Sequence, residues 1–122
     1  MSDAVDLEAL GEQLADFGDR AYLLTVTDDH LPHVVSVQVI LQGDRLATSV
    51  GRRTGANLAA RPTATFLWPP PTSDGDYSLI VDGTAVDATG EGPLSVQPTA
   101  AVLHRVAGAA GAGPTCVPVG PT

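Results

Sequence analysis

The sequence contains no lysine and a single cysteine, Cys116, and each scarcity excludes a class of chemistry. Without a lysine, the protein cannot form a Schiff base with a carbonyl substrate or use an amine as a general base. One cysteine cannot form an internal disulfide, and it cannot supply the several thiolates of a multi-cysteine metal site. Apart from histidine, all six basic residues are arginines, so the positions of these arginines carry the information about positive charge.

Positive charge is also scarce, because the formal net charge at pH 7 is −8. Nucleic acids and anionic membrane surfaces both attract positively charged proteins, so we expect neither as a partner. No apolar run approaches the roughly 20 residues that a membrane-spanning helix needs. The amino terminus is acidic and lacks the basic-then-apolar pattern of a secretory signal peptide, so the sequence predicts a cytoplasmic protein.

Aromatic residues make up only 4% of the chain, so Val, Leu, Ile and Ala must fill the core. A chain of this length is typical of one domain, which can bury roughly 65% of its unfolded surface. We place this domain at residues 1–106. Residues 107–122 form a tail rich in Gly, Ala and Pro, whose composition predicts disorder unless the tail docks on the barrel or on a partner.

The hydrophobic pattern predicts an amino-terminal helix over residues 3–17. Its apolar residues recur at spacings of three and four: Leu7, Leu10, Leu14 and Phe17. Ser2 or Asp3 can cap the start of this helix, and Gly18 is a typical residue for its end. The apolar stripe indicates core packing rather than a site.

Six further segments have the alternation or the β-branched content of strands. They are residues 21–27, 33–41, 46–50, 63–68, 77–88 and 94–106. Asp82-Gly83 can be a hairpin turn or a bulge in one long bent strand, and we favour the bulge. The last segment fits a strand and a helix equally well. The spacing predicts a mainly β fold, a small six-stranded antiparallel barrel, with the amino-terminal helix beside it and a short helix after the third strand. Such a barrel is filled by its own side chains, so a ligand must bind outside it.

Residues 44–62 stand out because four of the six arginines lie there. These are Arg45, Arg52, Arg53 and Arg61, with no acidic residue between the first and the last. The stretch predicts a strand that ends at Gly51 and a short helix that is capped by Thr54 and ends before Pro62. Arginines beside hydroxyls and the free N–H groups of a helix start suit an anionic ligand, most simply a phosphate. The alternative is that these arginines are ordinary surface charges on an acidic protein.

The histidines do not form a metal-binding motif. His30 lies in a predicted turn, His33 opens a strand and His104 lies near the carboxy end. No carboxylate spacing supports a zinc site, so we expect no metal. We interpret His33 as a strand-edge residue and His104 as a residue paired with an aspartate or exposed to solvent.

Four stretches, taken in order, resemble the pyridoxamine 5′-phosphate oxidase-like family, the FMN- or deazaflavin-binding split barrels. They are YLLTVTDDHLPHVVSV, GDRLATSVGRRTGANLAARP, VDGTAV and VQPTAAVLHRV. The resemblance covers residues 7–105 and implies a split β-barrel in which the last segment is a strand and the VDGTAV run lies within one strand. It also implies a homodimer with two cofactor sites between the subunits, for FMN, 5-deazaflavin or, in some members, haem.

The resemblance also implies which residues contact the cofactor. Val37 and Gln38 would lie against its ring, and Trp68 would cover the ring from the partner subunit. Asn57 would hold the loop that binds the phosphate. The phosphate itself would be held by Thr48, Ser49, Arg52, Arg53 and Thr54. Many cofactor-binding members carry a basic residue, usually Lys, where this sequence has Thr54.

Two functions follow from these observations. The first is a flavin- or deazaflavin-dependent oxidoreductase that acts on a small organic substrate as a homodimer. In such enzymes the cofactor carries the hydride, so the absence of an acid–base motif does not count against this function. The second is a non-catalytic protein that holds a cofactor or binds a partner at a degenerate site, which Thr54 in place of a basic residue favours.

Overall fold

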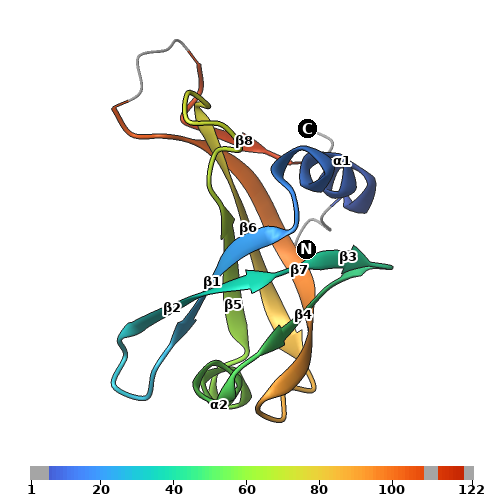
Figure 1. Ribbon diagram of the computed structural model, residues 1–122, viewed down its shortest axis with the longest axis vertical. Helices are drawn as coiled ribbons and strands as arrows, with labels where there is room; N and C mark the ends of the chain where they lie inside the picture. The colour runs from blue at the N-terminus through green and yellow to red at the C-terminus, as the bar shows by residue number, and fades with distance from the viewer. Residues whose placement is uncertain (1–5, 109–112, 120–122) are drawn as a thin grey trace.

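The computed structural model describes residues 6–108 and 113–119, which form a single antiparallel sheet with two helices (Figure 1). Along the chain the elements are α1 (Leu7–Phe17), β1 (Arg20–Val26), β2 (Pro32–Gln38), β3 (Ile40–Gln42), β4 (Arg45–Val50), α2 (Arg52–Ala60), β5 (Thr63–Trp68), β6 (Tyr77–Val86), β7 (Gly92–Arg105) and β8 (Cys116–Pro118). The mainly β fold and the two helices confirm the predicted fold class.

The order of the strands makes the sheet roll into a barrel. The main path runs β2-β1-β5-β6-β7-β4-β3, and β8 pairs with β7 outside this path. Its two edge strands, β2 and β3, are consecutive in the chain and separated only by Val39. The sheet must therefore curl until its two edges meet at this residue. The barrel is joined at the Val39 corner and splits open where β2 and the end of β4 diverge.

The predicted number of six strands is wrong, because the sheet has eight. The predicted strand 33–41 is broken at Val39, whose N–H donates to the carbonyl of Asp19 (2.7 Å). The chain turns there, so that β2 pairs with β1 and β3 pairs with β4. β8 is the other additional strand, and it lies in the tail.

The first helix begins at Leu7 rather than at residue 3. Its cap is Asp6, whose carboxylate accepts a hydrogen bond from the N–H of Ala9 (3.1 Å). Ser2 and Asp3, which we expected as caps, lie outside the described residues. The helix ends at Phe17, and Gly18 follows with φ of 89°, as predicted for a glycine at this position.

Aliphatic side chains fill the core together with two aromatic ones, Phe66 and Trp68. The other large, fully buried side chains are Leu10, Leu23, Val39, Leu46, Leu58, Leu79, Val81 and Val96. Along β2 the odd-numbered residues are half-buried and the even-numbered ones are exposed. This alternation sends His33, Val35 and Val37 toward the inside of the barrel.

The structure decides the two open predictions in the second half of the chain. A register shift between Asp82 and Gly83 confirms that β6 is one strand with a bulge. A Cβ atom at Gly83 would lie 2.5 Å from Cγ1 of Val96, so the bulge requires glycine. The last segment is the long strand β7, because it pairs with β6 from Ser95 to Arg105 and with β4 from Gly92 to Val96.

The tail docks on the barrel, at least over its described part. β4 covers the edge of β7 only from Gly92 to Val96, which leaves the later part of this edge without a partner. β8 pairs there, with residues 102–104. The prediction of disorder is therefore wrong for residues 116–118, because free strand-edge groups favour pairing over solvent. Residues 109–112 and 120–122 lie outside the described part. No described helix has both the length and the apolar character needed to cross a bilayer.

Candidate functional site

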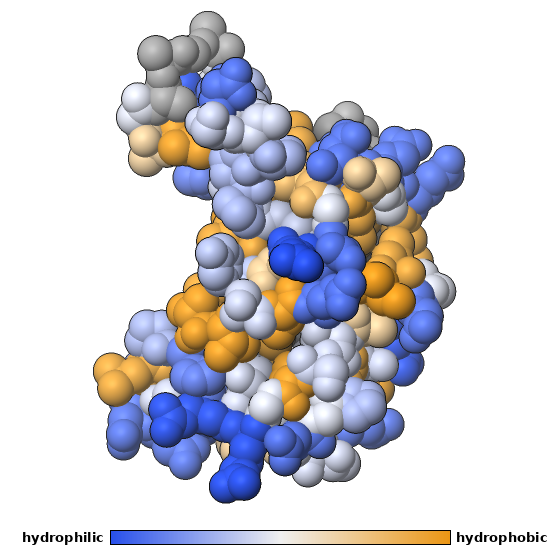
Figure 2. Space-filling view, viewed as in Figure 1, coloured by the Kyte–Doolittle hydropathy of each residue, from blue (hydrophilic) through white to orange (hydrophobic). Residues whose placement is uncertain are grey.

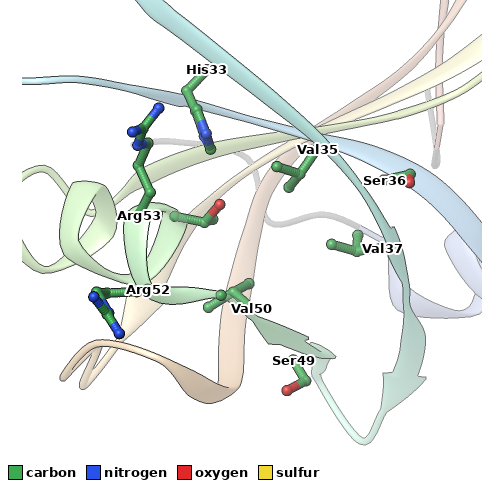
Figure 3. Close-up of a pocket in the computed structure, with 10 residues that line it drawn as sticks. His33, Val35, Ser36, Val37, Ser49, Val50, Arg52 and Arg53 are labelled. Carbon is green, nitrogen blue, oxygen red and sulfur yellow. The ribbon is translucent and has the colours of Figure 1, made fainter.

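The split in the barrel forms a cleft of about 370 Å³, within the size range of small-molecule sites (Figure 3). One side of the cleft is β2, and the other side is the end of β4 with the start of α2. The residues that line it are His33, Val35, Ser36, Val37, Ser49, Val50, Gly51, Arg52, Arg53 and Thr54. The end of β4 and the start of α2, which belong to the arginine-rich stretch at residues 44–62, therefore face β2 across the cleft.

The two ends of the cleft differ in chemistry. Val35, Val37 and Val50 provide apolar surface at one end, while Arg52 and Arg53 stand at the start of α2 (Figure 3). Both arginines are exposed, so their guanidinium groups can reach a ligand without moving core residues. This arrangement suits a molecule with a flat apolar part and an anionic end.

The start of α2 is available to an anion. The N-cap residue is Gly51, which has no side chain to cap the helix, and the first turn contains no acidic residue. The first hydrogen bond of the helix runs from the N–H of Gly55 to the carbonyl of Gly51 (2.9 Å). The N–H groups of Arg52, Arg53 and Thr54 thus have no intrahelical acceptor. These groups and the helix dipole favour a phosphate at this position.

The prediction that Thr54 caps the short helix is wrong. This residue lies inside α2, because the chain enters the helix through the extended Gly51. Thr54 nevertheless belongs to the site, since it lines the cleft while only 2% of its surface is exposed. Its hydroxyl has no hydrogen-bond partner among the described residues.

A second polar group at the cleft is also unpaired. Nδ1 of His33 is buried and has no hydrogen-bond partner among residues 6–108 and 113–119. Figure 3 shows the imidazole of His33 and the guanidinium of Arg53 beside each other, from opposite sides of the cleft. Buried polar atoms in folded proteins almost always have partners, so the unpaired Nδ1 of His33 points to a bound molecule or water in this cleft.

Contacts behind the cleft hold α2 in place. Asn57 is only 6% exposed, and its amide nitrogen donates to Oγ1 of the buried Thr25 on β1 (3.1 Å). At the end of the helix, Arg61 donates to the carbonyl of Val26 (3.0 Å) and pairs with Asp28 (2.9 Å). These contacts fix the positions from which Arg52 and Arg53 extend.

The structure brings together five of the nine residues that the resemblance assigns to the cofactor. Those in the cleft are Val37, Ser49, Arg52, Arg53 and Thr54. Asn57 lies behind the cleft, where it anchors α2. Gln38 and Thr48 lie outside the cleft, at the joined corner of the barrel. There Oγ1 of Thr48 donates to the carbonyl of Gln38 (2.6 Å), and the amide of Gln38 donates to Asp19 (2.7 Å). These hydrogen bonds help to close the corner, and the contacts of Gln38 and Thr48 with a cofactor stay predictions.

The assignment of Trp68 to the cofactor is wrong. Trp68 is 0% exposed, and its indole N–H donates to the carbonyl of Gly18 (3.1 Å). Its ring packs at a tilt against Phe66, with the ring centroids 6.0 Å apart. The alternation of β5 places Ala64, Phe66 and Trp68 on the core face, so the indole cannot cover a ligand on the surface.

Four residues of the cleft that carry side chains were not assigned to the cofactor from the sequence, namely His33, Val35, Ser36 and Val50. The period of the second strand could have indicated two of them, because His33 and Val35 share the face of Val37. No group of His, Cys, Asp or Glu suitable for a metal ion occurs in the described part of the chain.

Two mycobacterial proteins are similar to this chain in sequence. They are the uncharacterized protein Mb0449c of Mycobacterium bovis and the uncharacterized protein MT0457 of Mycobacterium tuberculosis. Each is 43% identical over 117 residues, which covers 83% of this chain and 80% of the relative. No protein-family model matches the chain.

Several solved structures share the fold. An F420 reductase has a TM-score of 0.61 at 19% identity, over 74% of this chain and 94% of that one. A putative pyridoxamine 5′-phosphate oxidase from Listeria innocua has a TM-score of 0.62 at 14% identity, over 77% and 97%. A heme binding protein from Mycobacterium smegmatis has a TM-score of 0.63 at 18% identity, over 82% and 55%. These structures confirm the split-barrel fold that the resemblance predicts.

Proposed function

The chain belongs to the family of the mycobacterial proteins Mb0449c and MT0457, and we propose that it binds a flavin or 5-deazaflavin in the split of its barrel and acts as an oxidoreductase. The observation that carries this proposal is that the two ends of the cleft differ in chemistry. Apolar surface from β2 and β4 lies at one end, and an uncapped helix start with two arginines lies at the other. Flavin and deazaflavin cofactors have the matching form, a tricyclic ring joined to a phosphate.

The residues present fit such a cofactor. Val35, Val37 and Val50 offer surface to a ring. The phosphate would accept hydrogen bonds from the N–H groups at the start of α2 and from Arg52 and Arg53. The hydroxyl of Thr54, which lacks a partner among the described residues, would gain one from the same phosphate. These arginines can supply the charge for which the resemblance implies a basic residue where this sequence has Thr54.

A bound flavin or deazaflavin supplies hydride transfer, and the protein supplies binding and orientation. The structures named as an F420 reductase and a putative pyridoxamine 5′-phosphate oxidase share this barrel, which supports the proposal. The structure named as a heme binding protein shares it too, so the ligand must be identified by its spectrum. Flavin, deazaflavin and haem absorb differently in the near-ultraviolet and visible range.

We also propose that the protein works as a homodimer. Three neighbouring pairs of outward residues on β1 and β2 contain no charged group: Tyr22 with Ser36, Leu24 with Val34, and Val26 with Pro32. The fourth outward pair, Arg20 with Gln38, lies at the end of these strands next to the Val39 corner. Over the middle of the molecule, where Figure 1 places β1, β2 and β5, hydrophobic residues reach the surface (Figure 2). A second copy suits this face, because a twofold interface repeats the same patch and an uncharged patch avoids repulsion between two acidic chains. The second copy would also border the open side of the cleft.

Cofactor binding tests the proposal directly. FMN and the 5-deazaflavin are titrated into the purified protein, and binding is followed by their fluorescence. We expect micromolar or tighter binding of at least one cofactor and its loss in the double variant Arg52→Ala/Arg53→Ala. The matched control is Arg20→Ala/Arg45→Ala, which removes the same charge from exposed positions outside the cleft. If neither cofactor binds to the unmodified protein, the proposal is wrong.

Turnover separates an oxidoreductase from a protein that only holds the cofactor. We expect the bound cofactor to be reduced by a small-molecule donor and reoxidised by an acceptor over many cycles. Bound cofactor that accepts no electrons from any donor would favour the non-catalytic alternative.

A further inference from the structure

A second cleft lies on the other side of Arg53, between the β1–β2 turn and α2, with a volume of about 490 Å³. Its lining residues are Thr27, Asp28, Asp29, Leu31, Arg53, Ala56 and Asn57. Arg53 lines this cleft as well as the cleft in the barrel split, so its side chain lies between the two. A ligand whose phosphate contacts Arg53 can therefore continue into the second cleft.

Hydrogen bonds hold both walls of the second cleft. In the turn, the N–H of Thr27 donates to the carbonyl of Leu31 (2.9 Å), and the N–H of Leu31 donates to Oγ1 of Thr27 (3.1 Å). The pair between Arg61 and Asp28 ties the turn to the end of α2. Asn57 ties the helix to β1. The second cleft is thus a built feature and not a gap between loose segments.

One polar atom of the lining has no protein partner in the described part of the chain. Only 6% of the surface of Asn57 is exposed, yet this residue lines the cleft. Only one of its two amide heavy atoms has a side-chain hydrogen-bond partner among the described residues, namely the atom that contacts Thr25. The other atom remains available to a group inside the cleft.

The remaining lining selects the kind of group. Asp29 is exposed and has no ion-pair partner within the described ranges, so its carboxylate can accept hydrogen bonds from hydroxyls. Leu31, which is 60% exposed, and Ala56 add apolar surface. Hydroxyls next to a flat apolar ring are the chemistry of a nucleoside, and carboxylates bind ribose hydroxyls in many nucleotide sites. Asp28 and Asp29 would repel a ligand whose extension into this cleft carries carboxylates of its own.

We propose that the second cleft binds the nucleoside part of a flavin dinucleotide and thereby makes the site prefer FAD over FMN. Arg53, which faces both clefts, would contact the pyrophosphate that joins the two halves. The preference rests on the proposed function, because it requires the flavin phosphate to lie at Arg52 and Arg53.

The test compares the dissociation constants of FMN and FAD, measured by fluorescence titration with the full chain. We expect FAD to bind at least about tenfold more tightly, which a few additional hydrogen bonds can supply. Ala56→Phe fills the second cleft and should bring FAD to the affinity of FMN, without changing FMN binding. Ala59→Phe is the matched control, because Ala59 is an exposed residue of the same helix outside both clefts. Asp29→Asn should lower the FAD preference in the same way.

Each outcome decides the proposal. An FAD preference that Ala56→Phe removes and Ala59→Phe retains supports it. Equal binding of FMN and FAD, or a preference that survives Ala56→Phe, overturns it while the proposed flavin site stands. Binding of the deazaflavin alone overturns this inference and leaves the proposed function standing, whereas failure of both flavins and of the deazaflavin to bind overturns both.

Discussion

The unpaired polar groups at the cleft are the most informative feature at the scale of single residues. Alternation along β2 predicts which face a residue occupies, and it places His33 beside Val35 and Val37 correctly. It does not predict that Nδ1 of His33 is buried without a partner among the described residues, since that depends on α2 packing across the split. The role of Thr54 was hidden for a similar reason. A threonine near a helix start resembles a cap, and only the chain path through Gly51 shows that it is not one.

Replacing Thr54 with valine tests whether its hydroxyl serves a ligand. The side chain keeps its shape and loses a hydroxyl that belongs to the lining of the cleft and has no protein partner within the described ranges. We expect the free energy of unfolding to change by less than about 1 kcal/mol, because no hydrogen bond within the described protein is lost. Cofactor affinity should fall by roughly threefold to tenfold, the value of one hydrogen bond. Urea denaturation and fluorescence titration measure the two quantities.

Thr25→Val is the control for this substitution. It removes a buried hydroxyl that does have a partner, the amide of Asn57. The variant should lose about 1–3 kcal/mol of stability, because the Asn57 amide is left unpaired. A loss of the same size in Thr54→Val would show that the hydroxyl of Thr54 supports the fold instead of a ligand.

At the scale of elements, local pattern predicted most of the sheet. The strand at Thr63–Trp68 and the bulge at Asp82-Gly83 follow from β-branched content and a glycine in a strand. The break at Val39 could not be predicted, because HVVSVQVIL alternates without interruption and the break arises from pairing with different strands on each side. The position of β8 depends in the same way on an edge of β7 that β4 leaves open.

Gly55 in α2 fixes how closely this helix approaches the β6–β7 connection. A Cβ atom there would lie 2.3 Å from the carbonyl group of Gly90, which is backbone and cannot turn aside. We expect Gly55→Ala to cost about 1–3 kcal/mol of stability and to displace α2, with weaker cofactor binding as a result. Thermal and urea denaturation measure the cost.

Gly11→Ala is a matched substitution in the other helix with the opposite expected sign. A Cβ atom at Gly11 would meet Cδ2 of Leu41 at 3.6 Å, an ordinary contact. Alanine favours a helix interior over glycine, so this variant should gain about 0.5–1 kcal/mol. If Gly55→Ala were equally stabilising, the close approach of α2 to Gly90 would not exist in solution.

The joined corner of the barrel depends on the hydroxyl of Thr48. Its hydrogen bond to the carbonyl of Gln38 ties β4 to the end of β2. Thr48→Val should cost about 1 kcal/mol. It should also speed up amide hydrogen exchange at Val39, whose N–H is bonded to Asp19 at the same corner. Thr48→Ser keeps the hydroxyl and should restore slow exchange, which a general packing defect would not allow.

At the scale of the whole molecule, the main question is what covers the uncharged part of the outward face of β1 and β2, from Tyr22 to Val26 and from Pro32 to Ser36. The resemblance led us to expect a homodimer, and that expectation remains a proposal. The face could not be identified from the sequence, because Tyr22, Val34 and similar residues look the same whether they face the core or a second subunit. Their exposure follows from the register of β1 against β2 and from the direction in which the barrel curls.

Val34→Asp tests the dimer, because Val34 is 53% exposed in the middle of this face. If a second copy covers it, two aspartates enter the interface without partners, and an unpaired charge is costly to bury. The dimer dissociation constant should then rise by at least about tenfold, measured by size-exclusion chromatography with light scattering. Val106→Asp makes the same change at another exposed valine outside this face and should leave the dimer intact.

Cofactor affinity should fall together with dimerisation in Val34→Asp alone, because the proposed cofactor site borders the second copy. A wild-type protein that is monomeric at every concentration, yet binds the cofactor tightly, would show that one barrel is sufficient and that the uncharged face serves another purpose.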